Sequence, residues 1–301
     1  MAKEPLVSIG VPVRNGERYL AEALDLLVNQ TYRNIEIIVS NNNSNDASFE
    51  IAQRFARLDN RIRMHQQSRT LTAFENFRFV FEKCRGEFFM WAACDDRRSL
   101  DFVERMLAEL QRRPDASLAF GEVAEYSDGS NWRDASVIPY MFETEVGAST
   151  SARLIRYLRL NCLQIYGLIR SSALASYEWM DIDNGPDIPL LVHLAITGEF
   201  VRASGGCFYY YVPPVAKSLR DRAKHNSLSP LRPFPELRLA WACAVTARRS
   251  GRQNGRPIML PYAFIIGYAT RHWRWIKPRI FAAAPPVLVG AYRRWCKRGR
   301  P

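Results

Sequence analysis

The sequence lacks several patterns that identify common classes of protein. Its six cysteines, at positions 84, 94, 162, 207, 243 and 296, form no CxxC pair and no zinc-like spacing. Its four histidines show no metal or triad spacing, and the chain contains no internal repeat and no low-complexity linker. These absences exclude a zinc finger, a repeat protein and a disulfide-rich secreted scaffold, so we expect reduced thiols in a cytosolic setting.

Long apolar segments are also missing. The first five residues run directly into a strand-like segment and carry no apolar core of a signal peptide. Two charge-free segments, 257–270 and 280–292, are 14 and 13 residues long. Neither reaches the ~20 residues that a membrane-spanning helix needs. We therefore expect a cytoplasmic product.

Positive charge is concentrated in the last part of the chain. The net charge is +12, yet residues 217–301 hold 19 Lys and Arg against two acids, while the rest is mildly acidic. Trp273, Trp275 and Trp295 lie among these cations. The pattern predicts a mostly helical region on an anionic membrane surface, peripheral to the inner face of the cell membrane. The alternative is a helical appendage whose basic face is solvated or packs on the preceding domain. No nucleic-acid recognition module accompanies it.

Apolar runs that predict strands alternate with amphipathic segments that predict helices. The predicted strands cover 6–13, 35–40, 61–66, 88–93, 117–127 and 208–211. Helices are predicted over 17–30, 71–84, 100–112, 154–160 and 188–197, and in the stretch that follows the polar cluster 41–46 and ends at residue 57. Residues 128–145 read as a loop. The alternation predicts an α/β domain over residues 1–216, with a mostly parallel sheet flanked by helices. Residues 217–301 would form the basic helical appendage.

Polar clusters follow three of the predicted strands. They are the segments 14–17, 41–46 and the pair Asp95 and Asp96. Because the carboxyl ends of parallel strands meet at one edge of a sheet, these clusters should converge. Carboxylate oxygens suit Mg²⁺ or Mn²⁺, which is typically shared with a phosphate group. The alternative role for the two acids is to cap the helix that begins near Ser99.

Several ordered motifs resemble those of the family 2 glycosyltransferases, which have the GT-A fold. They are VSIGVPVRNGERYL at 7–20, NQTY at 29–32, IEIIV at 35–39, ENF at 75–77, GEF at 86–88 and the acidic pair at 95–96. The resemblance covers about residues 6–215. It implies an enzyme that transfers a hexosyl or deoxyhexosyl group from a nucleotide-sugar donor, with inversion, as in the synthesis of cell-envelope polysaccharide.

The same resemblance implies roles for residues around the donor. Those expected to bind the nucleotide sugar are Pro12, Val13, Arg14, Asn15, Glu17, Asn41, Asn42, Asn76 and Asp95. Asp96, with Asp95, would hold Mg²⁺ or Mn²⁺ on the diphosphate, where the cation neutralises the departing group. The expected partners are a UDP-, dTDP- or GDP-linked sugar and a glycan or lipid-linked glycan acceptor.

A base must accept the proton of the acceptor hydroxyl, and Asp187 is our candidate. Spacing alone fits an N-cap aspartate equally well, and Asp181 and Asp183 are nearby substitutes. On the acceptor side we expect Trp91, Gly167 and Arg170, which in the alternative reading belong to the core or to a plain turn.

The chain departs from the family pattern at three places. Ala93 stands where many members have an acid, Asn41 and Asn42 replace the usual acids after the second strand, and Val212-Pro213-Pro214 replaces an Arg-x-His pattern. An amide keeps hydrogen-bonding capacity but loses charge. These departures leave two other hypotheses open, a nucleotidyltransferase on a similar scaffold and a degenerate module that binds sugar nucleotides or membranes without catalysis.

Overall fold

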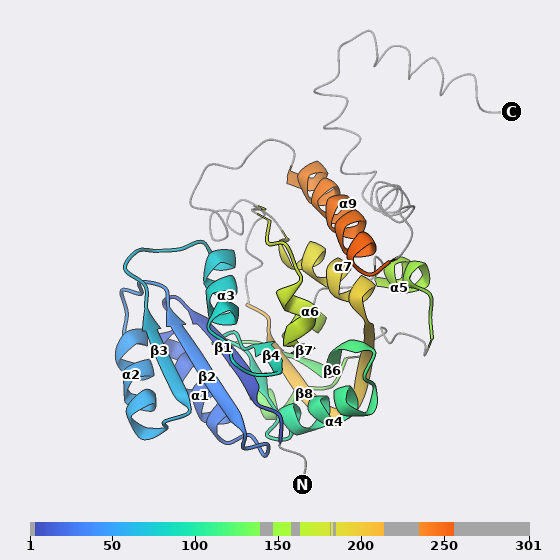
Figure 1. Cartoon of the computed structure of the whole chain (residues 1–301). Coiled ribbons are helices and arrows are strands. Elements are labelled where there is room, and N and C mark those ends of the chain that lie inside the picture. The colour runs from blue at the N-terminus through green and yellow to red at the C-terminus, as the bar shows by residue number, and fades with distance from the viewer. Residues whose placement is uncertain are drawn as a thin grey trace, which may run out of the picture.

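The computed structural model describes residues 4–138, 147–157, 163–180, 182, 185–213 and 235–255. In this part of the chain an eight-stranded sheet has the order β3-β2-β1-β4-β7-β6-β8-β5 (Figure 1). The strands are β1 Val7–Val13, β2 Ile35–Asn41, β3 Ile62–Gln66, β4 Phe88–Trp91, β5 Arg97–Arg98, β6 Ala116–Tyr126, β7 Leu168–Arg170 and β8 Glu199–Tyr211. The α/β class and the predicted strand positions in the first half of the chain are confirmed.

The first half of the sheet is parallel. β1 pairs with β2 and with β4, and β2 pairs with β3, all in parallel register. Every residue of β1, β2 and β4 is buried, which explains why apolar residues predominate in these strands. The second half is mixed, because β7 is antiparallel to both β4 and β6 and β5 is antiparallel to β8, whereas β6 and β8 are parallel.

Helices cover both faces of this sheet. They are α1 Glu17–Val28, α2 Ser48–Leu58, α3 Ala73–Glu82, α4 Phe102–Arg112, α5 Thr150–Tyr157, α6 Ser171–Ala175, α7 Asp187–Thr197 and α9 Pro235–Gln253, with short 3₁₀ helices at Trp132–Asp134 and Leu163–Tyr166. One core packs α1, α2 and α4 against one face, and a second core packs α3, α6, α7 and α9 against the other. The site at the sheet edge is therefore supported from both sides.

Helix α9 is the described part of the basic C-terminal region. It packs on α7, burying Leu239, Cys243 and Ala247, while Trp241 on its outer face is 69% exposed. No helix in the described ranges is both long and apolar enough to cross a bilayer. Of the region 217–301 that was predicted to lie on a membrane, residues 217–234 and 256–301 fall outside the described residues.

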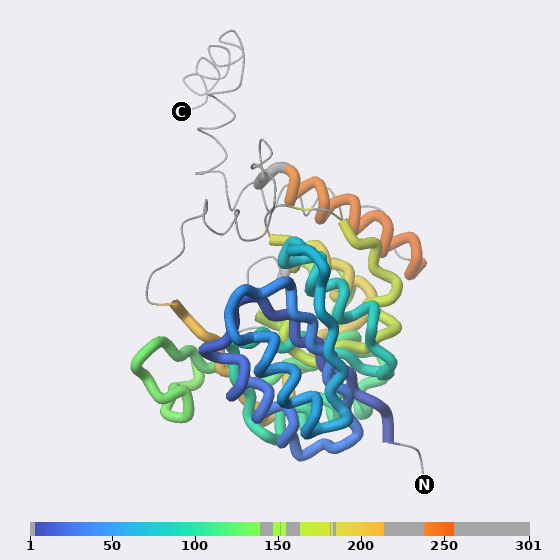
Figure 2. The backbone as a smooth tube through the Cα atoms, turned by 90° about the vertical axis from the view of Figure 1, so that its left-hand side faces the viewer, coloured from blue at the N-terminus to red at the C-terminus, as the bar shows by residue number. Residues whose placement is uncertain are grey.

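The loop after β6 protrudes beside the end of β8, as Figure 2 shows in green. Its Trp132 packs edge-on against Tyr209 of β8 and donates its Nε1–H to Glu22 of α1 at 2.8 Å. Its Asp128 pairs with Arg18 at 2.8 Å. The loop is thus fastened to α1 and β8 at the border of the sheet edge described next.

Candidate functional site

A cleft of about 790 Å³ lies at the carboxyl ends of β1, β2 and β4. It is lined by Pro12, Val13, Arg14, Asn15, Gly16, Tyr19, Asn42, Leu71, Ala73, Asn76, Phe77, Ala93, Cys94, Asp95, Tyr166, Tyr211 and Pro213. The three polar clusters predicted from the sequence do meet at this edge, as parallel strand topology requires. Seven of the nine residues expected around the donor line this cleft, and Glu17 and Asn41 do not.

The loop after β1 is held by the loop after β2. Asn15 adopts a positive φ of 53°, its Oδ1 accepts the backbone N–H of Asn45 at 3.0 Å, and its own N–H donates to Ser44 Oγ at 2.9 Å. The carboxylate of Glu17 accepts the N–H of Ala47 at 3.0 Å, next to the start of α2. Glu17 therefore fastens this loop instead of facing the cleft, and Arg14 remains exposed at the cleft.

The two asparagines after β2 lie in different environments. Asn41 is buried, and its Nδ2 donates to Gln66 Oε1 at 2.7 Å on the neighbouring strand β3. Asn42 lines the cleft, where its amide makes two hydrogen bonds with the backbone of Leu71, at 3.0 and 2.7 Å. Asn41 therefore ties β2 to β3, and Asn42 shapes the cleft wall through the segment before α3.

The adjacent carboxylates of Asp95 and Asp96 also differ. Asp95 is half-buried and lines the cleft. Asp96 is 4% exposed, and its Oδ1 accepts the N–H of Tyr211 at 3.1 Å. Burial, together with the charge of Asp95, raises the pKa of Asp96 to about 8. Contrary to our expectation, Asp96 is not among the residues that line the cleft, because its side chain is buried and bonded to the last residue of β8.

Two buried arginines hold this acidic turn. The guanidinium of Arg97 donates to the carbonyls of Cys94 and Asp96, at 3.2 and 3.0 Å, and pairs with Glu22 of α1 at 2.8 Å. Arg98 donates to the Trp91 carbonyl at 2.7 Å, and burial lowers its pKa to about 10. These contacts hold the backbone of the turn on both sides of Asp95. The N-cap of α4 is Asp101, so neither Asp95 nor Asp96 has the capping role that we considered.

A pair of tyrosines closes one side of the cleft. The hydroxyls of Tyr19 and Tyr211 are 3.1 Å apart, and Tyr19 also reaches Asp128 of the protruding loop at 3.5 Å. This hydrogen bond to Tyr19 and burial raise the pKa of Tyr211. The aromatic run at 208–211 was a signal for Tyr211, although its residues read as core.

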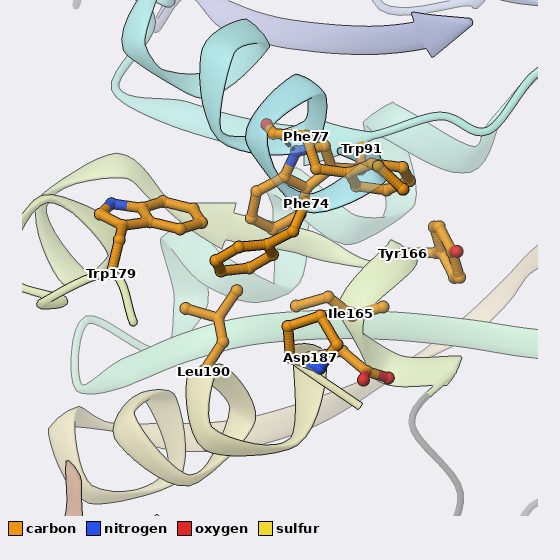
Figure 3. Close-up of a pocket in the computed structure, with 10 residues that line it drawn as sticks. Phe74, Phe77, Trp91, Ile165, Tyr166, Trp179, Asp187 and Leu190 are labelled. Atoms are coloured by element: carbon orange, nitrogen blue, oxygen red, sulfur yellow. Dashed lines mark hydrogen bonds between the residues drawn. The ribbon is translucent and has the colours of Figure 1, made fainter. Parts of the chain in front are cut away.

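A second pocket, of about 200 Å³, opens beside the cleft and shares Ala73, Phe77 and Tyr166 with it. We call it the aromatic pocket. Its other lining residues are Phe74, Trp91, Ile165, Trp179, Pro186, Asp187 and Leu190. In Figure 3 the ring of Trp179 lies at one end, and the carboxylate of Asp187 lies on the side of Tyr166. The structure thus brings Trp91 and Asp187 together, two residues that are almost a hundred positions apart in the sequence.

Asp187 is the first residue of α7 and is half-buried. Pro186 occupies the N-cap position of this helix, so Asp187 is not the N-cap residue. Burial raises the pKa of Tyr166 well above its usual range, and the charges of Asp95, Asp96 and Asp187 add to this shift. The acids of both pockets therefore act on one tyrosine. Asp181 and Asp183 lie outside the described residues.

Gly167 and Arg170 have structural surroundings that differ from the expected acceptor side. A Cβ on Gly167 would lie 2.3 Å from the carbonyl oxygen of Ala119, so the close approach is to the protein's own strand β6. The guanidinium of Arg170 donates to the carbonyls of Ala116, at 2.8 Å, and of Leu110. Neither residue is among those that line the cleft or the aromatic pocket, because Arg170 joins the end of α4 to β6.

The donor atoms of the cleft suit a divalent cation that is shared with a phosphate group. Asp95 is the one acid among the described cleft-lining residues, and no group of three His, Cys, Asp or Glu side chains in the described ranges could enclose a metal. Mg²⁺ is commonly held by one or two carboxylates together with substrate phosphates. A single hard oxygen ligand at a cleft large enough for a nucleotide fits that pattern.

Comparisons with known proteins agree with this geometry. The sequence model of "Glycosyl transferase family 2" matches residues 8–177, more than half of the chain. EpsH of Bacillus subtilis, named as a glycosyltransferase, is 37% identical over 134 residues, which are 44% of this chain and 38% of EpsH. Glycosyltransferase GlyG of Streptococcus pneumoniae is 32% identical over 127 residues, which are 42% of each chain. The matched part of the chain thus spans about two fifths of the length of these curated relatives.

Solved structures share the fold. Residues 1–349 of S. aureus TarS in complex with UDP-GlcNAc give a TM-score of 0.67 at 15% identity, covering 92% of this chain and 75% of that one. The mannosyltransferase PcManGT of Pyrobaculum calidifontis, in complex with GDP-Man and Mn²⁺, gives a TM-score of 0.53 at 13% identity, covering 90% of this chain and 88% of that one. At these identities the likeness concerns the architecture alone.

Proposed function

This chain belongs to glycosyl transferase family 2 and has the GT-A fold, and from that premise we propose that it transfers a sugar from a nucleotide-diphosphate donor to an acceptor hydroxyl by single displacement with inversion. The observation that carries the proposal is the position of two acids. Asp95 lines a cleft of nucleotide size, and Asp187 lines the adjoining pocket. Two carboxylates in connected cavities can serve the leaving group and the nucleophile separately.

The donor would occupy the cleft at the ends of β1, β2 and β4. Arg14 supplies an exposed cation beside the loop after β1, and Asn42 and Asn76 shape the opposite wall. The neighbours crystallised with UDP-GlcNAc, UDP and GDP-Man support a nucleotide sugar as the donor. We propose a UDP-, dTDP- or GDP-linked sugar as the donor.

The proposed cofactor is Mg²⁺ or Mn²⁺, and Asp95 would hold it. When bound, such a cation neutralises the charge that develops on the departing diphosphate. We assign this role to Asp95 instead of Asp96, because the carboxylate of Asp96 is buried and accepts the N–H of Tyr211. Arg97 maintains the geometry by holding the carbonyls on either side of Asp95.

Asp187 would accept the proton of the acceptor hydroxyl. In a single displacement the nucleophile attacks opposite the leaving group, so the base must lie apart from the diphosphate site. Asp187 satisfies this requirement, since it lies on α7 in the adjoining pocket whereas Asp95 follows β4. The helix start is also a favourable place for a carboxylate that must be ionised to act as base.

We propose further that the acceptor is a glycan or lipid-linked glycan met at an anionic membrane surface. The basic residues of 217–301 supply the charge, and the exposed Trp241 of α9 shows an aromatic side chain on the outer face of this region. Aromatic and cationic side chains together suit the interface of an anionic bilayer. Co-sedimentation with phosphatidylglycerol vesicles, and its absence with phosphatidylcholine vesicles, would support this part of the proposal.

A thermal-shift screen with UDP, dTDP and GDP, each with and without Mn²⁺, tests the donor site. A ligand at 100 times its Kd adds about 2.7 kcal/mol to the stability of the folded state, which should shift the melting temperature by several degrees. We expect a shift that needs Mn²⁺ and is lost in Asp95→Asn but kept in the exposed control Glu50→Gln. The Asp187→Asn variant should keep the shift and lose transfer. A shift unaffected by Asp95→Asn would remove the metal assignment.

A further inference from the structure

The pocket beside Asp187 is walled almost entirely by apolar and aromatic side chains. Phe74, Phe77 and Trp91 lie on one side and Leu190 on the other. The indole N–H of Trp91 is already used, because it donates to the carbonyl of Phe77 at 2.9 Å. Polar groups line it chiefly on the side of Tyr166 and Asp187 (Figure 3). Among the described lining residues, those at the far end of the pocket therefore offer little hydrogen bonding to a ligand.

A cluster of rings makes this apolar end rigid. The ring of Trp179 lies 5.4 Å from Phe74 and 6.4 Å from Trp91, measured between centroids, and 5.3 Å from Tyr177 behind it. Arg78 lies over the indole of Trp179 at 5.9 Å. Aromatic pairs in such offset and edge-on arrangements stabilise one another. These ring contacts hold the apolar side chains of the pocket against one another.

The pocket is continuous with the cleft through Ala73, Phe77 and Tyr166. With a diphosphate at Asp95 and the base at Asp187, the reacting bond would lie near this junction. A sugar at that bond would extend one of its substituents into the apolar end. The volume of about 200 Å³ is below the roughly 300–1,000 Å³ of sites for drug-sized ligands, so one small group fits better than a lipid chain.

We infer that this pocket selects a sugar that carries a methyl group, either at C6 of a 6-deoxyhexose or at the end of an acetamido group, over the matched sugar that has only a hydroxyl at that position. The inference rests on the proposed function and deepens it. A hydroxyl forced against Phe74, Trp179 and Leu190 would lose its hydrogen bonds to water without gaining a partner. A methyl group at the same place gains from burial.

Two matched pairs of methyl glycosides test this selectivity on the full chain. They are methyl α-L-rhamnoside against methyl α-L-mannoside, and methyl β-N-acetylglucosaminide against methyl β-glucoside. We expect one pair to show a preference of about 10- to 100-fold for the methyl-bearing sugar in Kd, measured by ligand-observed NMR titration. Equal binding, or a preference for the hydroxyl-bearing sugar in both pairs, would overturn the inference.

Two substitutions on the same helix provide the matched control. Phe74→Ala opens the apolar wall and should reduce the preference to about 3-fold or less. Phe79→Ala removes a half-buried ring of α3 that packs on His65 outside the pocket, and it should leave the ratio unchanged. A preference that survives Phe74→Ala would place the selectivity elsewhere and overturn the assignment to this pocket. The ratio in the unmodified chain is decisive even if a variant folds poorly.

Competition with UDP-GlcNAc distinguishes whether the selected sugar belongs to the donor or the acceptor. If the nucleotide sugar displaces the glycoside and UDP does not, the pocket holds the donor sugar. If the glycoside stays bound, the pocket holds the acceptor. Either result supports the inference once the preference is seen. Failure of the proposed function would appear separately, as the absence of any nucleotide-induced shift in melting temperature with Mn²⁺.

Discussion

Replacing Arg97 with methionine should loosen the turn that presents Asp95 to the cleft. The Arg97 side chain is 3% exposed, and its guanidinium donates to the carbonyls of Cys94 and Asp96, one on each side of Asp95. Glu22 of α1 holds the guanidinium in place at 2.8 Å. Methionine retains much of the apolar stem of arginine but none of its donors. The substitution therefore removes the hydrogen bonds and largely keeps the packing.

The expected cost follows from these contacts. A buried carbonyl left without a donor costs about 1–3 kcal/mol, and the turn borders the open cleft, where solvent can replace part of the lost bonding, which favours the lower part of that range for each of the two carbonyls. The pair with Glu22 adds less than about 1 kcal/mol, because the Glu22 side chain is 44% exposed and can be rehydrated. We expect Arg97→Met to lower the free energy of unfolding by about 2–4 kcal/mol in total.

Urea unfolding measures the stability, and the nucleotide-induced shift in melting temperature measures the site. Arg97→Met should unfold at lower urea and show a smaller shift with nucleoside diphosphate and Mn²⁺. Arg105→Met, which removes an exposed arginine paired with Asp101 on α4, should change both by little. Wild-type stability and wild-type nucleotide binding in Arg97→Met would refute the reasoning, and would leave the bond from Tyr126 to the Asp95 carbonyl as the main support of the turn.

Three further predictions concern the surrounding framework. Gly167→Ala places a methyl group against the Ala119 carbonyl and should cost about 1–3 kcal/mol in urea unfolding, whereas an unchanged midpoint would contradict the close approach. Arg170→Leu should cost about 1–3 kcal/mol and leave the nucleotide-induced shift intact; loss of that shift would restore a role for Arg170 in binding. Burial lowers the pKa of His193 below its ordinary 6.5, so as the pH falls through 6.5 the unfolded chain takes up a proton that the folded chain does not, and stability decreases. Unfolding at about pH 7.5 and about pH 5.5 should show a larger loss in wild type than in His193→Gln, and equal losses would exclude His193 as the cause.

Prediction from sequence worked best where one strand is buried on both faces. β2 is buried along its whole length, has apolar residues at four of its seven positions, and was predicted at 35–40 against Ile35–Asn41 in the structure. β8 was predicted only over its last four residues, although it begins at Glu199. Gly205 and Gly206, with φ of 78° and 72°, interrupt the strand pattern, and a register shift between β6 and β8 accommodates them. Such a bulge depends on pairing with a distant strand, which local pattern does not reveal.

The convergence of the three polar clusters was predictable, because each cluster follows a strand in the parallel half of the sheet. Which of two adjacent carboxylates faces the cleft was not predictable, since the answer depends on the N–H of Tyr211, more than a hundred residues away. The aromatic pocket was missed for a different reason. The phenylalanines of α3, among them Phe74 and Phe77, form a helical stripe, and such a stripe usually packs into a core. In the structure both line a cavity that Trp179 and Leu190 complete from other elements.

The departures from the family pattern differ in their physical consequences. The amide of Asn41 donates to Gln66 and accepts from Ser44, and Asn41 does not line the cleft. The replacement of an acid by Asn41 therefore affects the contact between β2 and β3. Ala93 does line the cleft, which leaves Asp95 as its one acid among the described lining residues. A cation bound there would depend more on the phosphates of the donor than one held by two carboxylates. The affinity for metal and the affinity for nucleotide should therefore be strongly coupled in this chain. The nucleotide supplies oxygen ligands to the metal, and the metal supplies positive charge to the phosphates, and the protein alone provides little of either.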